Sequence, residues 1–201
     1  MSELSTKEKI LLAAHQLFAE KGRYGVSVRE IASASEVNVA AINYHFNNKE
    51  NLYAQTILSS IQKVEQDINN IHQQEGVEDP IAYAQKILDY FMENSQELRS
   101  VFIMLSSSHD APQELLERLQ QYQGPPGGQM LARVLSQVCP RAEIKDLEWA
   151  VRSIMGIIMH KSMIMANRSI CSSMEQVGIT VTTFRDEVGR LTNALIKELN
   201  S

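Results

Sequence analysis

Five histidines and two cysteines are the side chains of this 201-residue chain whose chemistry suits catalysis or metal binding. The histidines are dispersed, and the sequence contains no zinc-protease motif, nucleophile elbow, phosphate-binding loop or dinucleotide fingerprint. His109 and Asp110 are adjacent, which is more typical of a local turn than of a catalytic pair. A metal site would need Cys139, Cys171, His109 and His160 to converge without any ligand-pair spacing. We therefore expect no enzyme activity, no metal and no cofactor.

Residues 38–49 combine small side chains with hydrogen-bonding ones, and this combination suits DNA. An amide such as that of Asn43 can pair bidentately with adenine, and the methyl groups of Val39 and Ala40 can contact thymine methyls. Hydroxyl, imidazole and ammonium groups can bind the flanking phosphates. The candidate DNA contacts are Ser27, Arg29, Asn38, Val39, Ala40, Ala41, Asn43, Tyr44, His45 and Lys49.

Three short helices must position these side chains. Ser5 and Ser27 are each followed three residues later by glutamate, which is the pattern of a capping box at a helix start. Asn38 is a good N-cap for a third helix over 39–46. A tight connection at 35–37 separates the second helix from the third. The pattern predicts a helix-turn-helix, whose second helix enters the major groove.

The rest of the chain is predicted to be helical as well. Apolar residues recur every three or four positions, and only nine glycines and five prolines interrupt the sequence. A long helix is expected from about Asn48 to just before Gly76, residues 124–128 and Pro140 mark breaks, and two longer helices finish the chain. The expected fold is all-α with about nine helices: an N-terminal three-helix domain joined by the long helix to a helical domain for ligand binding and dimerisation.

The net charge of −5 argues at first against a nucleic-acid partner, because such proteins are usually basic. Residues 1–50, however, hold six basic and six acidic side chains, so the whole surplus lies in 51–201. A neutral head (1–50) joined to an acidic body (51–201) indicates two modules with different partners. We expect a DNA-binding domain over 1–50 and an effector-binding and dimerisation domain over 51–201.

The N-terminus has no cleavable apolar segment, and the apolar run at 154–159 is far shorter than a membrane-spanning helix needs. Two cysteines do not make a disulfide framework and fit a reducing compartment. We therefore expect a cytoplasmic protein with no membrane partner.

The first fifty residues resemble the N-terminal domain of the TetR family of bacterial transcriptional regulators. The matching motifs are ILxAAxxLFAEKG at 10–22, VSVREIA at 26–32, VNVAAINYHF at 37–46 and NKENL at 48–52. The resemblance implies that the equivalents of Ser27, Tyr44, His45 and Lys49 touch phosphates, while residues of the turn and third helix read bases.

Two positions depart from the family pattern. Glu36 stands in the turn where the family usually has glycine, so a left-handed backbone there would cost roughly 1 kcal/mol. Asn43 replaces a frequent tyrosine, which makes it a candidate for base specificity.

The resemblance also implies that the body binds a small inducer among its middle helices and dimerises through its last two. Methionine and phenylalanine side chains suit an irregular apolar cavity, which favours a hydrophobic or amphipathic effector, although plain core packing explains many of them. The pocket candidates are Phe91, Met92, Phe102, Met104, His109, Met155 and Met159. The helix over 147–165 is apolar nearly all round, so it needs burial on two sides. The dimer candidates are Ile154, Gly156, Ile158, Phe184, Val188, Leu191 and Leu195.

These inferences together favour a ligand-responsive transcriptional regulator, most often a repressor in such proteins. A homodimer would bind a pseudo-palindromic double-stranded operator and leave it when a small-molecule effector binds. The rival hypothesis is a helical ligand-binding or partner-binding module without a DNA role, whose head is only a packed subdomain. The sequence leaves open the effector, the operator and the choice between repression and activation.

Overall fold

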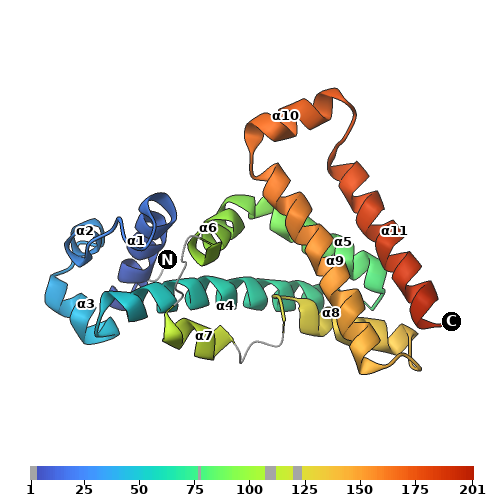
Figure 1. Ribbon diagram of the computed structural model, residues 1–201, viewed down its shortest axis with the longest axis horizontal. Coiled ribbons are helices and arrows are strands. Elements are labelled where there is room, and N and C mark those ends of the chain that lie inside the picture. Colours follow the sequence, from blue (N-terminus) through green and yellow to red (C-terminus); the bar gives the residue numbers. More distant parts are fainter. Residues whose placement is uncertain (1–3, 77, 107–111, 120–123) are drawn as a thin grey trace. The chain divides into compact units, whose positions relative to one another are not determined.

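A computed structural model describes residues 4–76, 78–106, 112–119 and 124–201. Within these ranges the chain forms eleven helices and no strand, so the all-α prediction is confirmed (Figure 1). The helices are α1 Thr6–Lys21, α2 Val28–Ala34, α3 Val39–Phe46, α4 Lys49–Glu75, α5 Pro80–Glu93, α6 Ser95–Ser106, α7 Gln113–Leu119, α8 Gly128–Val138, α9 Ile144–Met165, α10 Arg168–Gln176 and α11 Val181–Leu199.

Two local features raise the helix number above the nine expected. The apolar pattern runs from Pro80 to Leu105 without a proline or glycine, yet the helix breaks at Asn94. The backbone N–H of Asn94 and its side-chain amide both donate to the carbonyl of Tyr90, at 3.0 and 2.8 Å, and this local cap ends α5. The short helix α10 is polar and rich in serine, and it begins where the Asn167 side chain accepts from the N–H groups of Ser169 and Ile170.

The described residues group into two compact units. The first unit comprises the residues up to Lys63 together with those of Arg99–Tyr122, and the second comprises Val64–Leu98 with Gln123–Ser201. Helices α4 and α6 therefore each contribute residues to both units.

The core of the first unit fixes the three N-terminal helices against the start of α4. Its fully buried side chains include Phe18, Ile31, Ile42, Phe46, Leu52 and Tyr53. The rings of Phe18 and Tyr53 meet edge to face at 4.9 Å, and the Tyr53 hydroxyl donates to the carbonyl of Met104. Because α2 and α3 each bury one apolar face here, their opposite faces must point outward.

The second unit is built around α5, α9 and α11, which pack side by side (Figure 1). Gly189 in α11 allows a close approach to α5, because a Cβ at this position would lie 2.9 Å from the Gln85 amide nitrogen. Two ion pairs add polar contacts: Arg185 with Asp89 on α5, and the buried Lys161 of α9 with Glu187 of α11. No helix in the described ranges is long and apolar enough to cross a membrane.

Candidate nucleic-acid interface

The second and third helices begin at the caps that the sequence predicts. The Ser27 hydroxyl accepts from the Glu30 N–H, while the Glu30 carboxylate accepts from the Ser27 N–H at 2.8 Å. The Asn38 side chain accepts from the Ala41 N–H at 2.7 Å. Each cap satisfies backbone donors that the first helical turn leaves unpaired, so both helix starts are fixed in place.

The turn between α2 and α3 keeps the left-handed backbone that the family's glycine favours. Glu36 has φ +56°, and the Val37 N–H closes the turn on the carbonyl of Ala32 at 3.0 Å. The carboxylate residue thus occupies a conformation that L-amino acids disfavour, with a strain of roughly 1 kcal/mol. The left-handed backbone of the turn is therefore present despite this strain.

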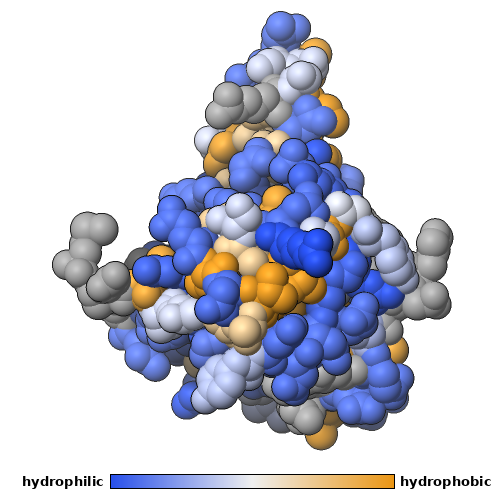
Figure 2. All heavy atoms as spheres, turned by 90° about the vertical axis from the view of Figure 1, so that its left-hand side faces the viewer, coloured by the Kyte–Doolittle hydropathy of each residue, from blue (hydrophilic) through white to orange (hydrophobic). Residues whose placement is uncertain are grey.

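Most of the predicted base-reading side chains are exposed along α3. Asn38, Val39, Ala40 and Asn43 are exposed, whereas Ala41 is half-buried. Figure 2 looks onto the side where α2 and α3 lie and shows a small apolar patch among hydrophilic side chains. Small methyl groups next to amides are the composition that permits close approach to base edges.

The residues predicted to contact phosphates differ in how far their side chains are exposed to solvent. Tyr44 is 83% exposed, and its ring meets the half-buried His45 ring edge-on at 5.2 Å. Arg29 is exposed on α2. The Lys49 ammonium is half-buried and donates to the carbonyl of Val26 at 3.2 Å, which leaves two of its three protons for another acceptor.

One exposed aromatic residue of the N-terminal part was not predicted as a contact from the sequence. Tyr24 lies between α1 and α2 with 70% of its surface exposed, and the Arg23 guanidinium stacks 4.5 Å from its ring centre. The adjacent arginine and tyrosine in the short connection before α2 are the sequence signal that could have drawn attention to them.

The Glu30 cap predicts a dependence of stability on acid pH. Hydrogen bonds from the Ser27 backbone and hydroxyl, with a further one from Lys21, lower the Glu30 pKa from 4.5 to about 2. Because the folded pKa lies below the unfolded one, the stabilisation is complete above about pH 4.5 and is lost as the pH falls toward 2.

We expect Glu30→Gln to remove this part of the acid dependence, because glutamine does not titrate. Urea midpoints measured from pH 2 to 6 would show it as a shallower slope below pH 4.5 than wild type. Glu143→Gln is the control, since its exposed carboxylate accepts no backbone hydrogen bond. Parallel slopes for wild type and Glu30→Gln would contradict the role of the cap.

The predicted effector residues do not come together in one described cavity. Phe91 and Met155 are buried in the core of the second unit, and Met92 and Met159 pack against that core. Met104 is buried in the core of the first unit. Phe102 is exposed, and His109 lies outside the described residues.

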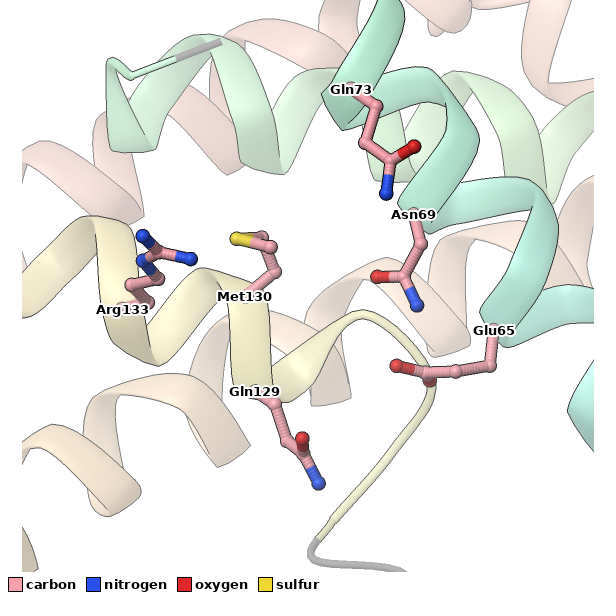
Figure 3. A pocket seen from close by; sticks show the side chains of 6 residues that line it. All are labelled: Glu65, Asn69, Gln73, Gln129, Met130 and Arg133. Atoms are coloured by element: carbon pink, nitrogen blue, oxygen red, sulfur yellow. The ribbon is translucent and has the colours of Figure 1, made fainter. Parts of the chain in front are cut away.

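Two pockets in the second unit have other linings. One, of about 410 Å³, lies between α4 and α8 (Figure 3). The other, of about 850 Å³, lies between α8 and α9 and includes Leu147, Val151 and Arg152. The polar residues of the first pocket recur every four positions on each helix, and this spacing is the sequence signal from which the pocket lining could have been predicted.

The predicted dimer residues lie mostly inside the chain. Five of them are buried in the core of the second unit: Ile154, Ile158, Phe184, Val188 and Leu195. Leu191 packs against this core. Gly156 is exposed on α9, and a Cβ there would meet no atom within 4 Å. A partner chain would therefore meet Gly156 and its exposed neighbours in place of these buried side chains.

Comparison with known proteins agrees with this geometry. The sequence profile of the bacterial regulatory proteins of the tetR family matches residues 10–56. The chain is 36% identical to the Bacillus subtilis (strain 168) protein named "Probable HTH-type transcriptional regulator YttP" over 104 residues. These residues make up 50% of each of the two chains. Over 51 residues it is 37% identical to IcaR, the HTH-type negative transcriptional regulator of the biofilm operon icaADBC in Staphylococcus aureus (strain Newman), or 25% of this chain and 27% of IcaR. The chain thus spans about half the length of one relative and about a quarter of the other.

Solved structures share the whole fold. The fatty acid degradation regulator FadR of Bacillus halodurans superposes with a TM-score of 0.66 at 16% identity, covering 96% of both chains. A TetR-like transcriptional regulator from Rhodococcus sp. RHA1 superposes with a TM-score of 0.63 at 16% identity, again over 96% of both. Residues 10–56 thus match the tetR family of bacterial regulatory proteins, and the fold is that of TetR-like regulators.

Proposed function

We propose that this protein is a ligand-responsive repressor that binds a pseudo-palindromic operator as a homodimer. The observation that carries the proposal is the exposed face of α3, where Val39, Ala40 and Asn43 stand on a helix fixed by caps and a buried core. A rigid helix with small and amide side chains outward is suited to the major groove. The DNA-binding role is assigned to residues 1–50 and the effector and dimer roles to 51–201.

Repression is favoured by one relative, because IcaR carries the name of a negative regulator. The effector would act by preferring a conformation of the body in which the two heads of a dimer do not match the half-sites. Its effect on occupancy cannot exceed its difference in affinity between the two conformations.

The homodimer would use the outward faces of the last two long helices. On α9 the exposed residues Trp149, Arg152, Gly156 and His160 follow one another at helical spacing. Gly156 would let the two backbones approach closely. Two-fold symmetry would then place the recognition helices about 34–36 Å apart or a multiple of that distance.

Salt-dependent retention on random-sequence duplex DNA tests the proposal most directly. We expect binding that weakens steeply as salt rises, because phosphate contacts release counterions. The rival module without a DNA role predicts no retention at any salt concentration. Selection from random duplexes should then return inverted repeats, and a site without dyad symmetry would contradict the dimer.

Asn43→Ala should relax base specificity. If the Asn43 amide pairs with adenine, its loss should remove roughly 1–3 kcal/mol of discrimination at one base pair of each half-site. Sites selected with the variant should lose the preference at that position and keep the others. Identical selected sites for wild type and variant would refute the role of Asn43 in base reading.

A further inference from the structure

The pocket between α4 and α8 has a polar lining in place of the apolar one that we expected for an effector site. Its volume of about 410 Å³ lies in the usual range for small-molecule sites. Three residues from each helix line it: Glu65, Asn69 and Gln73 on α4, and Gln129, Met130 and Arg133 on α8. Only Met130 is apolar, so an acyl chain would find little apolar surface here.

One carboxylate and two amide groups form a row along one side of the pocket. Glu65, Asn69 and Gln73 follow at intervals of four residues, so they are neighbours spaced about 6 Å apart along the helix axis. In Figure 3 the side chains of Asn69 and Gln73 turn into the space between the helices. Neither amide makes a hydrogen bond within the described ranges, so both can donate to and accept from a bound molecule.

The lining contains one negative and one positive side chain, Glu65 on α4 and Arg133 on α8. The Glu65 carboxylate is held by the N–H of Gly127 at 3.0 Å, directly before the start of α8. Arg133 lies six residues further along, or about 9 Å by the helical rise. Its guanidinium has no carboxylate partner among the residues described. The pocket thus offers one anion and one cation that has no carboxylate partner among the residues described.

A buried hydroxyl near Glu65 also lacks a protein partner. Tyr83 is fully buried, and its hydroxyl makes no hydrogen bond in the described part of the chain. Burial and the negative charge of Glu65 raise the Tyr83 pKa, so the phenol stays protonated and remains a donor. Buried polar atoms without a partner are rare in folded proteins. Tyr83 does not line the pocket, so its hydroxyl is an unpaired donor in the core beside Glu65 and makes no contact with the pocket itself.

We propose that this pocket binds a short zwitterionic peptide of two or three residues. Its ammonium group would lie at Glu65 and its carboxylate would form a bidentate pair with Arg133. Two or three residues supply one or two peptide groups between these charged ends, and a single amino acid supplies none. The amides of Asn69 and Gln73 would pair with the peptide groups. This inference rests on the proposed function, because the peptide would be the effector.

Calorimetric titration of the full chain with the tripeptide L-Ala-L-Ala-L-Ala tests the inference. We expect binding that weakens at least about tenfold when the peptide is either N-acetylated or C-amidated, since each cap removes one charge. Arg133→Met should weaken binding of the uncapped peptide by a similar factor. In this variant C-amidation of the peptide should have no further effect on binding. Arg141→Met is the matched control, because Arg141 is exposed and outside the pocket.

Glu65→Gln tests the other end of the site. Glutamine keeps an oxygen for the Gly127 N–H, so the local fold is preserved while the charge is lost. This variant should bind the free and the N-acetylated tripeptide equally. No heat up to about 5 mM peptide, or binding insensitive to both caps, would overturn the inference.

Retention on DNA, measured on the same preparations, separates this inference from the proposed function. Protein that binds DNA but not the tripeptide refutes the peptide site alone. Protein that binds the tripeptide with the expected sensitivity to its caps but does not bind DNA supports the peptide site and refutes the DNA-binding role.

Discussion

Replacement of Phe46 by alanine is expected to lower the free energy of unfolding of the first unit by about 3–5 kcal/mol. Phe46 is the last residue of α3, and its ring is fully buried in the core that α1, α2 and the start of α4 share. Alanine would lose the transfer free energy of the ring and leave a cavity. Because the same core holds α3 in place, DNA retention should fall with stability. Urea denaturation followed by circular dichroism measures the change.

Tyr44→Ala is the matched control, because Tyr44 lies on the same helix but is exposed. We expect its free energy of unfolding to stay within about 0.5 kcal/mol of wild type. Under the proposed function its DNA retention should nevertheless weaken, because the exposed phenol is a predicted phosphate contact. A Phe46→Ala protein with the wild-type midpoint would show that the ring does not contribute to this core.

Glu187→Ala is expected to destabilise the second unit by about 2–3 kcal/mol. Lys161 is buried, and its ammonium pairs with Glu187 and lies 4.2 Å from the centre of the Phe184 ring. Removal of Glu187 leaves a buried cation without its anion. The loss should be smaller than for a fully buried pair, since the Glu187 side chain is 47% exposed and water can reach it. Thermal or urea unfolding measures the difference.

Two further variants separate the charge effect from other losses. Lys161→Met keeps the apolar stem and removes the charge, so it should destabilise less than Glu187→Ala. Glu148→Ala breaks an exposed pair with Arg152 and should change stability by less than about 0.5 kcal/mol. Equal losses for Glu148→Ala and Glu187→Ala would show that burial of Lys161 has no effect.

Local sequence signals predict the N-terminal helices well. The caps at Ser5, Ser27 and Asn38 depend on residues three positions apart, so no distant contact is needed to form them. The left-handed turn at Glu36 follows from the glycine common in the family. Helical periodicity then identifies the buried faces of these short helices, and the opposite faces are the candidate DNA surface.

Contacts between residues far apart in the sequence could not be predicted from it. Periodicity shows that Phe91 and Met104 are on buried faces, but it does not show that they belong to the cores of different units. For the same reason an apolar stripe on α9 was compatible with either a partner chain or the chain's own core. The polar pocket depends on α4 and α8 meeting across some sixty residues of sequence, as the bond between Glu65 and Gly127 shows.

The strained turn at Glu36 has an evolutionary consequence. A single substitution to glycine would relieve roughly 1 kcal/mol of backbone strain without altering any buried contact, because Glu36 is exposed. The same substitution would remove a negative charge next to α3, the proposed recognition helix. A substitution at this position can therefore compensate for destabilising mutations elsewhere in the chain. It would do so without changing the exposed side chains of α3.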